Sequence, residues 1–339
     1  MSSQSTPSIP EPQGESPAPG SASPILDSGS HQVEGWITAS PPKFVEVLEH
    51  VFTFPRLLVR HRDLISTSVR RELSARFSGT LLGWAWPLVT PLLMFAIYYF
   101  IFTKLLSVKF GALPEDQQSA MGVFMFVGIL IWTAFGESVV RCTSVIVDNG
   151  NLIKKVAFPT EVLPLNQILV AMVTMAFGVL AFIAVTWLTP FFGLHIWTPP
   201  DTARLVWILV LVPLQVFFTY GIGLLLGTLQ VYLRDTQQVV TVGITVWMFA
   251  TPIFWTPELI INEAGDRGLP EEWAWVIDVN PMHHLVYAWR DILMSREPSM
   301  IFHGPVQDSV LTFGLWAAGS FVVGYTFFLL ARRRFADEV

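Results

Sequence analysis

Long uncharged stretches dominate the pattern of hydrophobic and polar positions along the chain. The runs without Lys, Arg, Asp or Glu are residues 77–103, 117–136, 162–200, 205–233, 236–257 and 309–331. Each run reaches roughly the 20 residues that a helix needs to cross about 30 Å of hydrocarbon. Because lipid offers the backbone no hydrogen-bond partners, only helices or closed barrels span it. The pattern predicts an all-α integral membrane domain over residues 77–334, with six transmembrane helices.

The segment 43–76, which precedes the first run, alternates bases with apolar residues and is broken once, at Pro55. Its apolar positions include Phe44, Val47, Leu48, Val51, Leu58, Ile65, Val69 and Leu73. This pattern predicts an amphipathic helix that lies along the inner leaflet. A simple anchor and a gate or partner-docking helix explain it equally well.

The stretch 258–305 between the fifth and sixth runs is too apolar for a plain loop and too polar to span. Within it, the spacing predicts a short helix over Pro281–Met294. One face of this helix carries Met282, Leu285, Val286, Trp289 and Leu293, and another carries His283, Tyr287 and Arg290. We expect helices here that re-enter the outer leaflet and that protein covers where the backbone is irregular.

Composition supports a membrane protein and sets the first 42 residues apart. Among 339 residues, 52% are hydrophobic and only 14% are charged, which excludes a soluble enzyme. Residues 1–42 hold eight Pro, ten Ser and no Lys or Arg. Such a composition cannot bury enough apolar surface to fold, and it lacks the basic and apolar regions of a signal peptide. We expect a disordered cytoplasmic tail.

The basic residues predict the orientation in the membrane. With six spans both termini lie on one side, and 14 of the 20 bases fall in the loops of that side. The other side holds Lys104, Lys109, Arg204, Arg267, Arg290 and Arg296. The positive-inside rule therefore puts both termini in the cytoplasm, with residues 335–339 as a short cytoplasmic C-terminus.

The predicted spans carry no charge in mid-membrane, where an ion-coupled transporter usually keeps one. Glu137 comes nearest, at the inner end of the second span, and it precedes Arg141 by four residues. An ion pair along one helix is the ordinary explanation for this spacing. The sequence therefore argues against a proton or sodium relay.

Nucleotide-binding and metal-binding motifs are also missing. None of the 23 glycines is followed by Lys, so no phosphate-binding G-x-x-x-x-G-K loop exists in this chain. The adjacent His283 and His284 point about 100° apart on a helix and lack further ligands at suitable spacing, so we expect no metal site. The single cysteine, Cys142, is typical of an inert packing residue.

A membrane glycosyltransferase or acyltransferase is the alternative from another functional class. Such an enzyme needs a carboxylate or histidine base in an external loop, for which Glu115, Asp116, Asp278 and the histidine pair are nominal candidates. None of them stands in a constellation with a second partner. We therefore assign no catalytic residue to the chain.

The connection after the second predicted span reads NGNLIKKVAFPTEVLP over residues 149–164. It resembles the N-x-x-L-I-x-K-x-x-F-P-x-x-x-L-P signature of ABC-2 type polysaccharide-export permeases, the family of the bacterial O-antigen and teichoic acid exporters. Further similar motifs are Arg71 with Arg76-Phe77, Leu82-Gly83 with Trp86 and Pro91, Arg234-Asp235, Pro252-Ile253, and Asn280-Pro281 with Arg290. The matches cover residues 60–334, and the Pro/Ser-rich tail resembles that of actinobacterial members, among them an exporter of lipid-linked galactan.

The resemblance implies a homodimer of six-span subunits, each resting on one of two separate ABC ATPase subunits. ATP and Mg²⁺ would bind to those subunits, so no cofactor is expected in this chain. The implied substrate is a polysaccharide linked to a polyprenyl diphosphate, and membrane lipids are further partners, with no role for nucleic acid. An ABC-2 permease for a drug or a lipid is the alternative within the same class.

The resemblance also implies which residues couple the membrane domain to the ATPase. Residues 149–155 would form a short coupling helix in which Leu152 and Ile153 are exposed apolar contacts for a protein partner. Anchoring of this pair against the inner leaflet is the alternative. The full set assigned to ATPase coupling is Asn149, Leu152, Ile153, Lys154, Lys155, Arg234 and Asp235.

Aromatic and basic residues complete the candidate sites. In the first span Trp84, Pro87, Pro91, Phe95, Tyr98 and Phe102 recur at spacings of three and four, as Ile244, Trp247, Thr251 and Phe254 do in the fifth. Aromatic faces let sugar rings slide, so we predict a substrate conduit, with helix packing as an equal alternative for each residue. At the cytoplasmic mouth, Arg70, Arg71 and Arg76 form a diphosphate gate or contact anionic lipid headgroups.

Overall fold

The computed structural model describes residues 56, 59–105, 120–155, 159–193, 196–257, 274–294, 306–332 and 335. In these residues the regular structure is entirely helical, which confirms the predicted all-α fold. They belong to one compact unit, Pro42–Val339. The predicted tail at 1–42, the start of the amphipathic segment and residues 336–339 lie outside the described residues, so the predicted domain boundaries there stay predictions.

Five helices are long and apolar enough to cross a membrane: Gly83–Phe102, Met121–Asp148, Val162–Phe192, Thr202–Tyr232 and Val306–Ala331. They coincide with five of the six predicted spans. The remaining predicted span, 236–257, forms the 15-residue helix α9 (Thr236–Ala250). This helix stops because Thr251 is extended before Pro252, as a residue preceding proline usually is. The number of crossings therefore stays a prediction.

The first span is not the single helix that the uncharged run predicted. Helix α2 (Arg62–Phe77) ends at the start of the run, and a turn with Gly79 and Gly83 in the left-handed region follows, where glycine is favoured. A short 3₁₀ helix, η2 (Gly83–Ala85), leads into α3 (Trp86–Tyr99), which passes into the π-helix η3 (Phe100–Leu105). The helical part of this span therefore begins at Gly83, and its α-helical part begins at Trp86.

Long helices form the centre of the unit: α4 (Ala120–Asp148), α6 (Val162–Leu188, followed by the 3₁₀ helix η5, Thr189–Phe192), α8 (Ile208–Tyr232) and α13 (Val306–Ala331). Helix α4 lies between α6 and α8, and α8 packs along α13. The last pair is close because Gly221 and Gly324 face each other. A Cβ on Gly324 would lie 1.9 Å from the Gly221 carbonyl oxygen, so only glycine permits this backbone contact.

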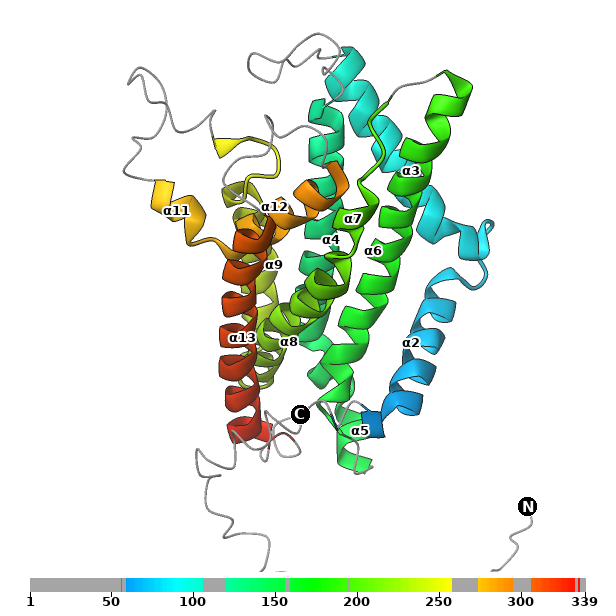
Figure 1. Ribbon diagram of the computed structural model, residues 1–339. Coiled ribbons are helices and arrows are strands. Elements are labelled where there is room, and N and C mark those ends of the chain that lie inside the picture. Colours follow the sequence, from blue (N-terminus) through cyan, green and yellow to red (C-terminus); the bar gives the residue numbers. More distant parts are fainter. Residues whose placement is uncertain are drawn as a thin grey trace, which may run out of the picture. The chain divides into compact units, whose positions relative to one another are not determined.

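The described chain begins and ends at the same end of the bundle (Figure 1). The short helix α5 (Gly150–Lys155) lies at this end, directly after α4. Two hydrogen bonds hold the helix ends together there: the Tyr220 hydroxyl donates to the Glu161 carbonyl over 2.9 Å, and the Tyr232 hydroxyl donates to the Ala331 carbonyl over 3.1 Å. An ion pair between Arg332 and Glu161 adds to them.

At the opposite end, α7 (Thr202–Leu205) precedes α8, and α11 (Ala274–Asp278) and α12 (Pro281–Met294) lie between α9 and α13 (Figure 1). Helix α12 has the predicted bounds. Both of its predicted faces are buried, because it packs on α4, α8 and α13. Protein therefore covers this helix, as expected for a re-entrant element.

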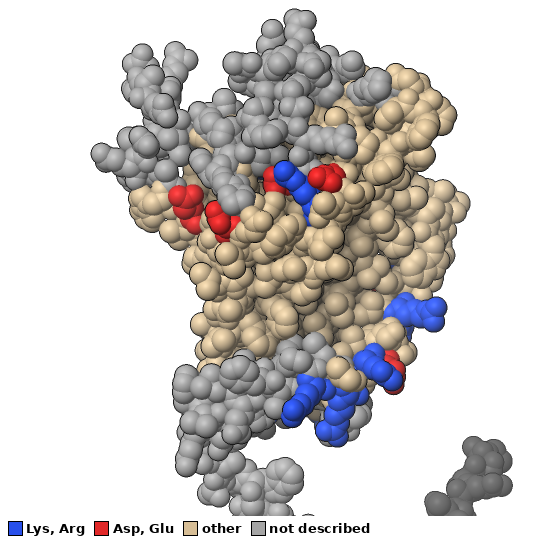
Figure 2. All heavy atoms as spheres, viewed as in Figure 1, with Lys and Arg blue, Asp and Glu red and all other residues tan. Residues whose placement is uncertain are grey.

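Charge is distributed unevenly on the face drawn in Figure 2. Lys and Arg gather at the end where α2 and α5 lie, and the broad middle of the surface is free of charge. Such a band is what a hydrocarbon layer requires of the surface that contacts it.

Candidate functional site

A cavity of about 370 Å³ lies between the end of α2, helix α3 and the helices α4 and α6. One face of α3 lines it with Trp86, Pro87, Thr90, Pro91, Met94 and Tyr98. Helix α4 contributes Phe126, Ile129, Leu130, Thr133, Ala134, Glu137 and Arg141, and α6 contributes Ala171, Thr174 and Met175. The lining is mainly apolar, with the hydroxyls of Thr90, Thr133, Thr174 and Tyr98 along it, and its charges lie at one end. Its size lies within the range of roughly 300–1,000 Å³ usual for small-molecule sites.

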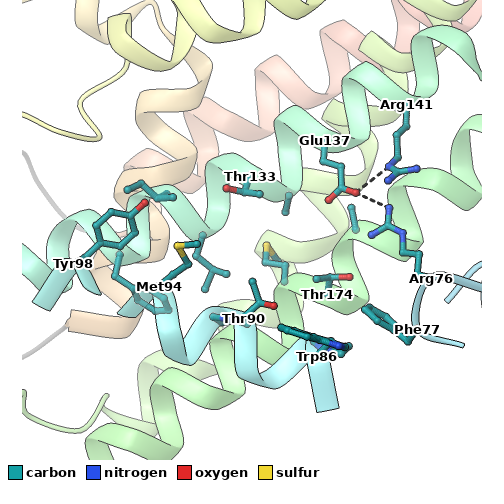
Figure 3. Close-up of a pocket in the computed structure, with 18 residues that line it drawn as sticks. Arg76, Phe77, Trp86, Thr90, Met94, Tyr98, Thr133, Glu137, Arg141 and Thr174 are labelled. Atoms are coloured by element: carbon teal, nitrogen blue, oxygen red, sulfur yellow. Dashed lines mark hydrogen bonds and ion pairs between the residues drawn. The ribbon is translucent and has the colours of Figure 1, made fainter. Parts of the chain in front are cut away.

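The polar end of the cavity holds a cluster of three charges (Figure 3). Oε1 of Glu137 accepts from Arg76 over 2.5 Å and from Arg141 over 2.9 Å. The predicted pair along α4 is thus confirmed, and Arg76, which lies 61 positions earlier, joins it. Nε of Arg76 is buried and has no hydrogen-bond partner among the described residues. The cluster carries a net charge of one positive unit and keeps a free donor.

The arginines predicted as a gate separate into two groups. Arg76 lines the cavity and is paired with Glu137, whereas Arg70 and Arg71 are exposed on the outside of α2. Sequence reasoning grouped them because they are close along the chain, but the helix turns them to different surroundings. Their roles toward a diphosphate or lipid headgroups stay predictions.

The aromatic stripe of the first span is also divided. Trp84 is 54% exposed in η2, with its ring centroid 5.9 Å from that of Phe77. Phe95 is buried, and its ring lies 4.9 Å from Phe126 and 6.0 Å from Phe182. Tyr98 lines the cavity and stacks at 6.4 Å on Phe102, which belongs to the π-helix. We predicted that the six positions share one face of one helix, and this prediction is wrong.

In the fifth predicted span Trp247 and Thr251 belong to a hydrogen-bond network around Asn280. Nε1 of Trp247 donates to Oδ1 of Asn280 over 2.9 Å, and Nδ2 of Asn280 donates to the Thr251 hydroxyl over 3.0 Å. The Trp247 ring also meets Trp132 and Phe135 edge to face, at 6.0 and 5.4 Å. Thr251 is fully buried, and Phe254 stacks at 5.6 Å on Phe249. In the described subunit Trp247 therefore makes extensive packing contacts.

Arg290 of α12 is a buried cation that sequence reasoning placed only within a motif. Its guanidinium donates to the carbonyls of Phe124 at 3.2 Å, Pro252 at 2.6 Å and Ile253 at 3.0 Å. Its Cζ atom lies 3.3 Å from the centre of the Phe124 ring. This side chain ties α12 to the start of α4 and to the break after α9. The break matters because Pro252 and Ile253 lie beyond the helix and need a donor from elsewhere.

A second basic residue at this end of the bundle, Arg204, pairs with Asp291 over 2.9 Å and so joins α7 to α12. Burial raises the pKa of the Asp291 carboxyl, while the charge and hydrogen bond of Arg204 act in the opposite direction. Because the net direction is upward, acidification breaks this ion pair at a higher pH than an ordinary aspartate would require.

The predicted coupling segment folds as α5, and its start is held by Asn149. The Asn149 carbonyl accepts from the amides of Leu152 and Ile153 over 2.9 and 3.2 Å, and its side chain donates to Val145 over 2.8 Å. Leu152 and Ile153 are half-buried and pack against the core, which corrects the prediction that they are exposed. Lys154 is exposed, and the Lys155 side chain lies outside the described part.

Arg234 and Asp235 are exposed in the turn between α8 and α9. Gln230 holds this turn from both sides, because its amide donates to the Arg234 carbonyl over 3.0 Å and accepts from the Gln237 amide over 2.8 Å. The sequence offered no sign of this role for Gln230, since a glutamine within an apolar helix has no characteristic spacing.

Other candidate residues have ordinary surroundings. Cys142 is buried and donates to the Pro164 carbonyl over 3.3 Å, as expected for a packing residue. Nε2 of His284 lies 2.7 Å from the Asp278 carbonyl oxygen. The described residues contain no group of three His, Cys, Asp or Glu side chains that could hold a metal ion. Glu115 and Asp116 lie outside the described part.

These features define the class of protein: a multi-pass helical membrane protein with a cavity between its helices and short helices at both ends. Residues 63–294 match the ABC-2 type transporter family, and the chain belongs to that family. The members of this family are membrane subunits of transporters.

The chain is similar to O-antigen export permeases from two organisms. It is 30% identical over 289 residues to the O-antigen export system permease protein RfbA of Myxococcus xanthus. The aligned region covers 84% of this chain and 98% of that protein. It is 28% identical over 234 residues to RfbA of Klebsiella pneumoniae, and this aligned region covers 69% of this chain and 81% of the relative. The resemblance to polysaccharide-export permeases is thereby confirmed.

Proposed function

We propose that this chain is the membrane permease of an ABC exporter that moves a lipid-linked polysaccharide across the bacterial inner membrane. The similarity to O-antigen export permeases, which extends over 98% of the Myxococcus relative, carries the proposal. A polyprenyl diphosphate is the proposed lipid carrier, and a galactan is the proposed glycan, because the Pro/Ser-rich tail resembles that of actinobacterial members.

The proposed transporter is a homodimer of this chain with two ATPase subunits that bind ATP and Mg²⁺. Since the chain has no G-x-x-x-x-G-K loop, ATP hydrolysis has to come from another polypeptide. We place α5 and the turn at Arg234 and Asp235 on the cytoplasmic side, together with both termini. The gathering of bases at that end supports this orientation.

Depletion of the protein in its native cell tests the proposal. A block in export should cause a full-length lipid-linked glycan to accumulate, and in sealed inside-out vesicles the glycan should be open to a glycosidase added from outside. Its sugar composition identifies the substrate, and a galactose polymer would support the narrower assignment. Re-expression of the wild-type chain is the control.

Accumulation of a shortened or unmodified lipid intermediate would instead indicate a glycosyl- or acyltransferase and contradict the proposal. An unchanged pool of lipid-linked glycans would also contradict it, because an exporter cannot be depleted without retention of its substrate.

A further inference from the structure

The cavity between α3, α4 and α6 combines two chemical environments in one space. Its charged end is formed by Arg76, Glu137 and Arg141. The remainder is lined mainly by apolar side chains such as Pro91, Met94 and Leu130, with the hydroxyls of Thr90, Thr133, Thr174 and Tyr98 among them. A ligand that fills both parts needs an anionic head and a hydrocarbon chain. We infer that this cavity binds the phosphate head and the first part of the chain of an amphiphilic lipid, and that Glu137 occupies the phosphate position when the site is empty.

The hydrogen bonds at the polar end support the placeholder role of Glu137. A single carboxylate oxygen accepts from both arginines, and Nε of Arg76 has no acceptor among the described residues although it is buried. A phosphate group carries more acceptor oxygens and about −1.5 to −2 charges at neutral pH. It could therefore accept a pair of hydrogen bonds from each guanidinium group. The single Glu137 oxygen that contacts both arginines offers no such pairs.

The position of α3 gives a lipid a path to the cavity. This helix packs on α4 and α6, while its other face is exposed and apolar, with Leu93 53% and Ile97 46% exposed. Met94 of α3 lines the cavity and is itself 43% exposed, so the cavity reaches the surface beside this helix. A chain from the surrounding hydrocarbon can thus pass the edge of α3 while its head stays at the charged end.

The lipid anchor of the proposed substrate supplies such an amphiphile, and this choice of source rests on the proposed function. A phospholipid of the bilayer is the other source with the same chemistry. The two differ in the chain, which is branched and unsaturated in a polyprenyl phosphate, and in the number of phosphate groups that the head carries.

Binding to the purified full-length chain in detergent tests the site without the ATPase or the glycan. The probes are farnesyl diphosphate, farnesol, inorganic diphosphate and phosphatidylglycerol, each titrated calorimetrically. We expect farnesyl diphosphate to bind at least about tenfold more tightly than farnesol or diphosphate alone, because only it fills both parts of the cavity. Tighter binding of farnesyl diphosphate than of phosphatidylglycerol assigns the site to the lipid anchor, and the reverse order assigns it to a bilayer lipid.

Three variants separate a binding site from a structural ion cluster. Glu137→Gln should tighten farnesyl diphosphate binding by about tenfold or more, the effect of removing one charge-assisted competitor. Arg141→Gln, at a half-exposed position, should weaken it by a similar factor. Ala171→Met narrows the apolar part of the cavity without changing a charge. In this variant farnesyl diphosphate should bind no more tightly than inorganic diphosphate. Leu93→Phe, at an exposed position of α3 that does not line the cavity, is the matched control and should bind as the wild type does.

The inference is overturned if no phosphate amphiphile binds, if Glu137→Gln weakens binding, or if Ala171→Met and Leu93→Phe behave alike. These results do not depend on what accumulates in depleted cells. Binding with the expected variant pattern but without glycan accumulation would reject the proposed export function and keep the lipid site.

Discussion

At the residue scale, Arg290 has the most specific environment in the described part of the chain. Its three carbonyl acceptors belong to segments that are 37 to 166 positions away in sequence. A buried guanidinium group is tolerated only if its N–H groups find hydrogen-bond acceptors, and these three carbonyls supply them. The side chain therefore holds α12, the start of α4 and the segment after α9 in one arrangement.

Replacing Arg290 with Met should lower the stability of the membrane domain by about 2–5 kcal/mol, because buried carbonyls lose their donor. Thermal unfolding of the purified protein measures the change. Arg204→Met is the matched control at the same end, and since Arg204 is 38% exposed we expect it to cost no more than about 1 kcal/mol. Equal losses for the two variants would show that Arg290 is not a structural tie.

The predicted conduit residues Trp247 and Tyr98 should now behave differently. Trp247→Ala removes two edge-to-face ring contacts and a hydrogen bond, so stability should fall by about 3–5 kcal/mol together with export. Tyr98 is only half-buried at the cavity, and Tyr98→Ala should leave stability near that of the wild type. If it lines the conduit, export should still fall.

Both quantities are measured on the same preparation, as thermal stability and as polymer export in reconstituted vesicles. A proportional loss of both in Tyr98→Ala would assign this residue to packing as well.

At the element scale, the contact between α8 and α13 depends on the absence of side chains. Gly221 and Gly324 bring the two backbones together, and the neighbouring Ser320 hydroxyl donates to the Phe218 carbonyl over 3.3 Å. In lipid, such close approach replaces the hydrophobic driving force that water would provide. In the chain, α9, α11 and α12 lie between these two helices, so the α8–α13 contact brings the two ends of that segment together.

Gly324→Ala should destabilise the bundle by about 1–3 kcal/mol, because the added methyl group overlaps backbone atoms that cannot move aside. Gly319→Ala lies on the same helix, five residues earlier, with nothing within 4 Å of the new Cβ. That control should be neutral or stabilising by up to about 1 kcal/mol, the helix propensity gained. Unfolding temperatures that do not differ between the two would contradict the backbone contact.

Helix α5 gives a second test at this scale. Since Leu152 and Ile153 pack against the core, their replacement would disturb folding, and exposed charges are the better probes. Lys154→Glu should weaken binding of the proposed ATPase and lower its stimulated hydrolysis, while thermal stability stays near that of the wild type. Co-purification of the ATPase measures the first effect. Normal capture and hydrolysis would remove Lys154 from the coupling surface.

At the scale of the whole molecule, the charges in the spanning helices bear on the source of energy. Glu137 is an acid well inside a candidate span, and both of its partners are arginines. One oxygen of this carboxylate already accepts from both guanidinium groups, which is the arrangement of a structural ion pair. We therefore expect no relay in the described spans that would couple transport to a proton gradient.

Export in inside-out vesicles should accordingly require ATP and continue after an uncoupler collapses the proton gradient. Vesicles without ATP, with the gradient intact, are the control and should not export. Loss of export on addition of the uncoupler, while ATP is still abundant, would support a secondary transporter instead.

Much of the element pattern was determined by the sequence itself. Uncharged runs of about 20 residues located five long helices, and the spacing from Pro281 to Met294 predicted α12 with its observed bounds. These features are local, because helix formation and membrane burial depend on residues within a few turns of one another. The motif at 149–164 was similarly visible and pointed to the family that the comparison confirms.

The surroundings of individual side chains were decided only by the tertiary structure. Sequence spacing placed Trp84 and Phe95 on one face, yet the chain turns at Gly79 and Gly83, and Phe95 packs against Phe126 and Phe182. Arg76 meets Glu137 across 61 positions, and Arg290 reaches Phe124 across 166. Contacts at such separations depend on how helices are placed against one another, and in an apolar chain many placements satisfy the same hydrophobic pattern. For this reason the cavity and its charged end could be found only in three dimensions.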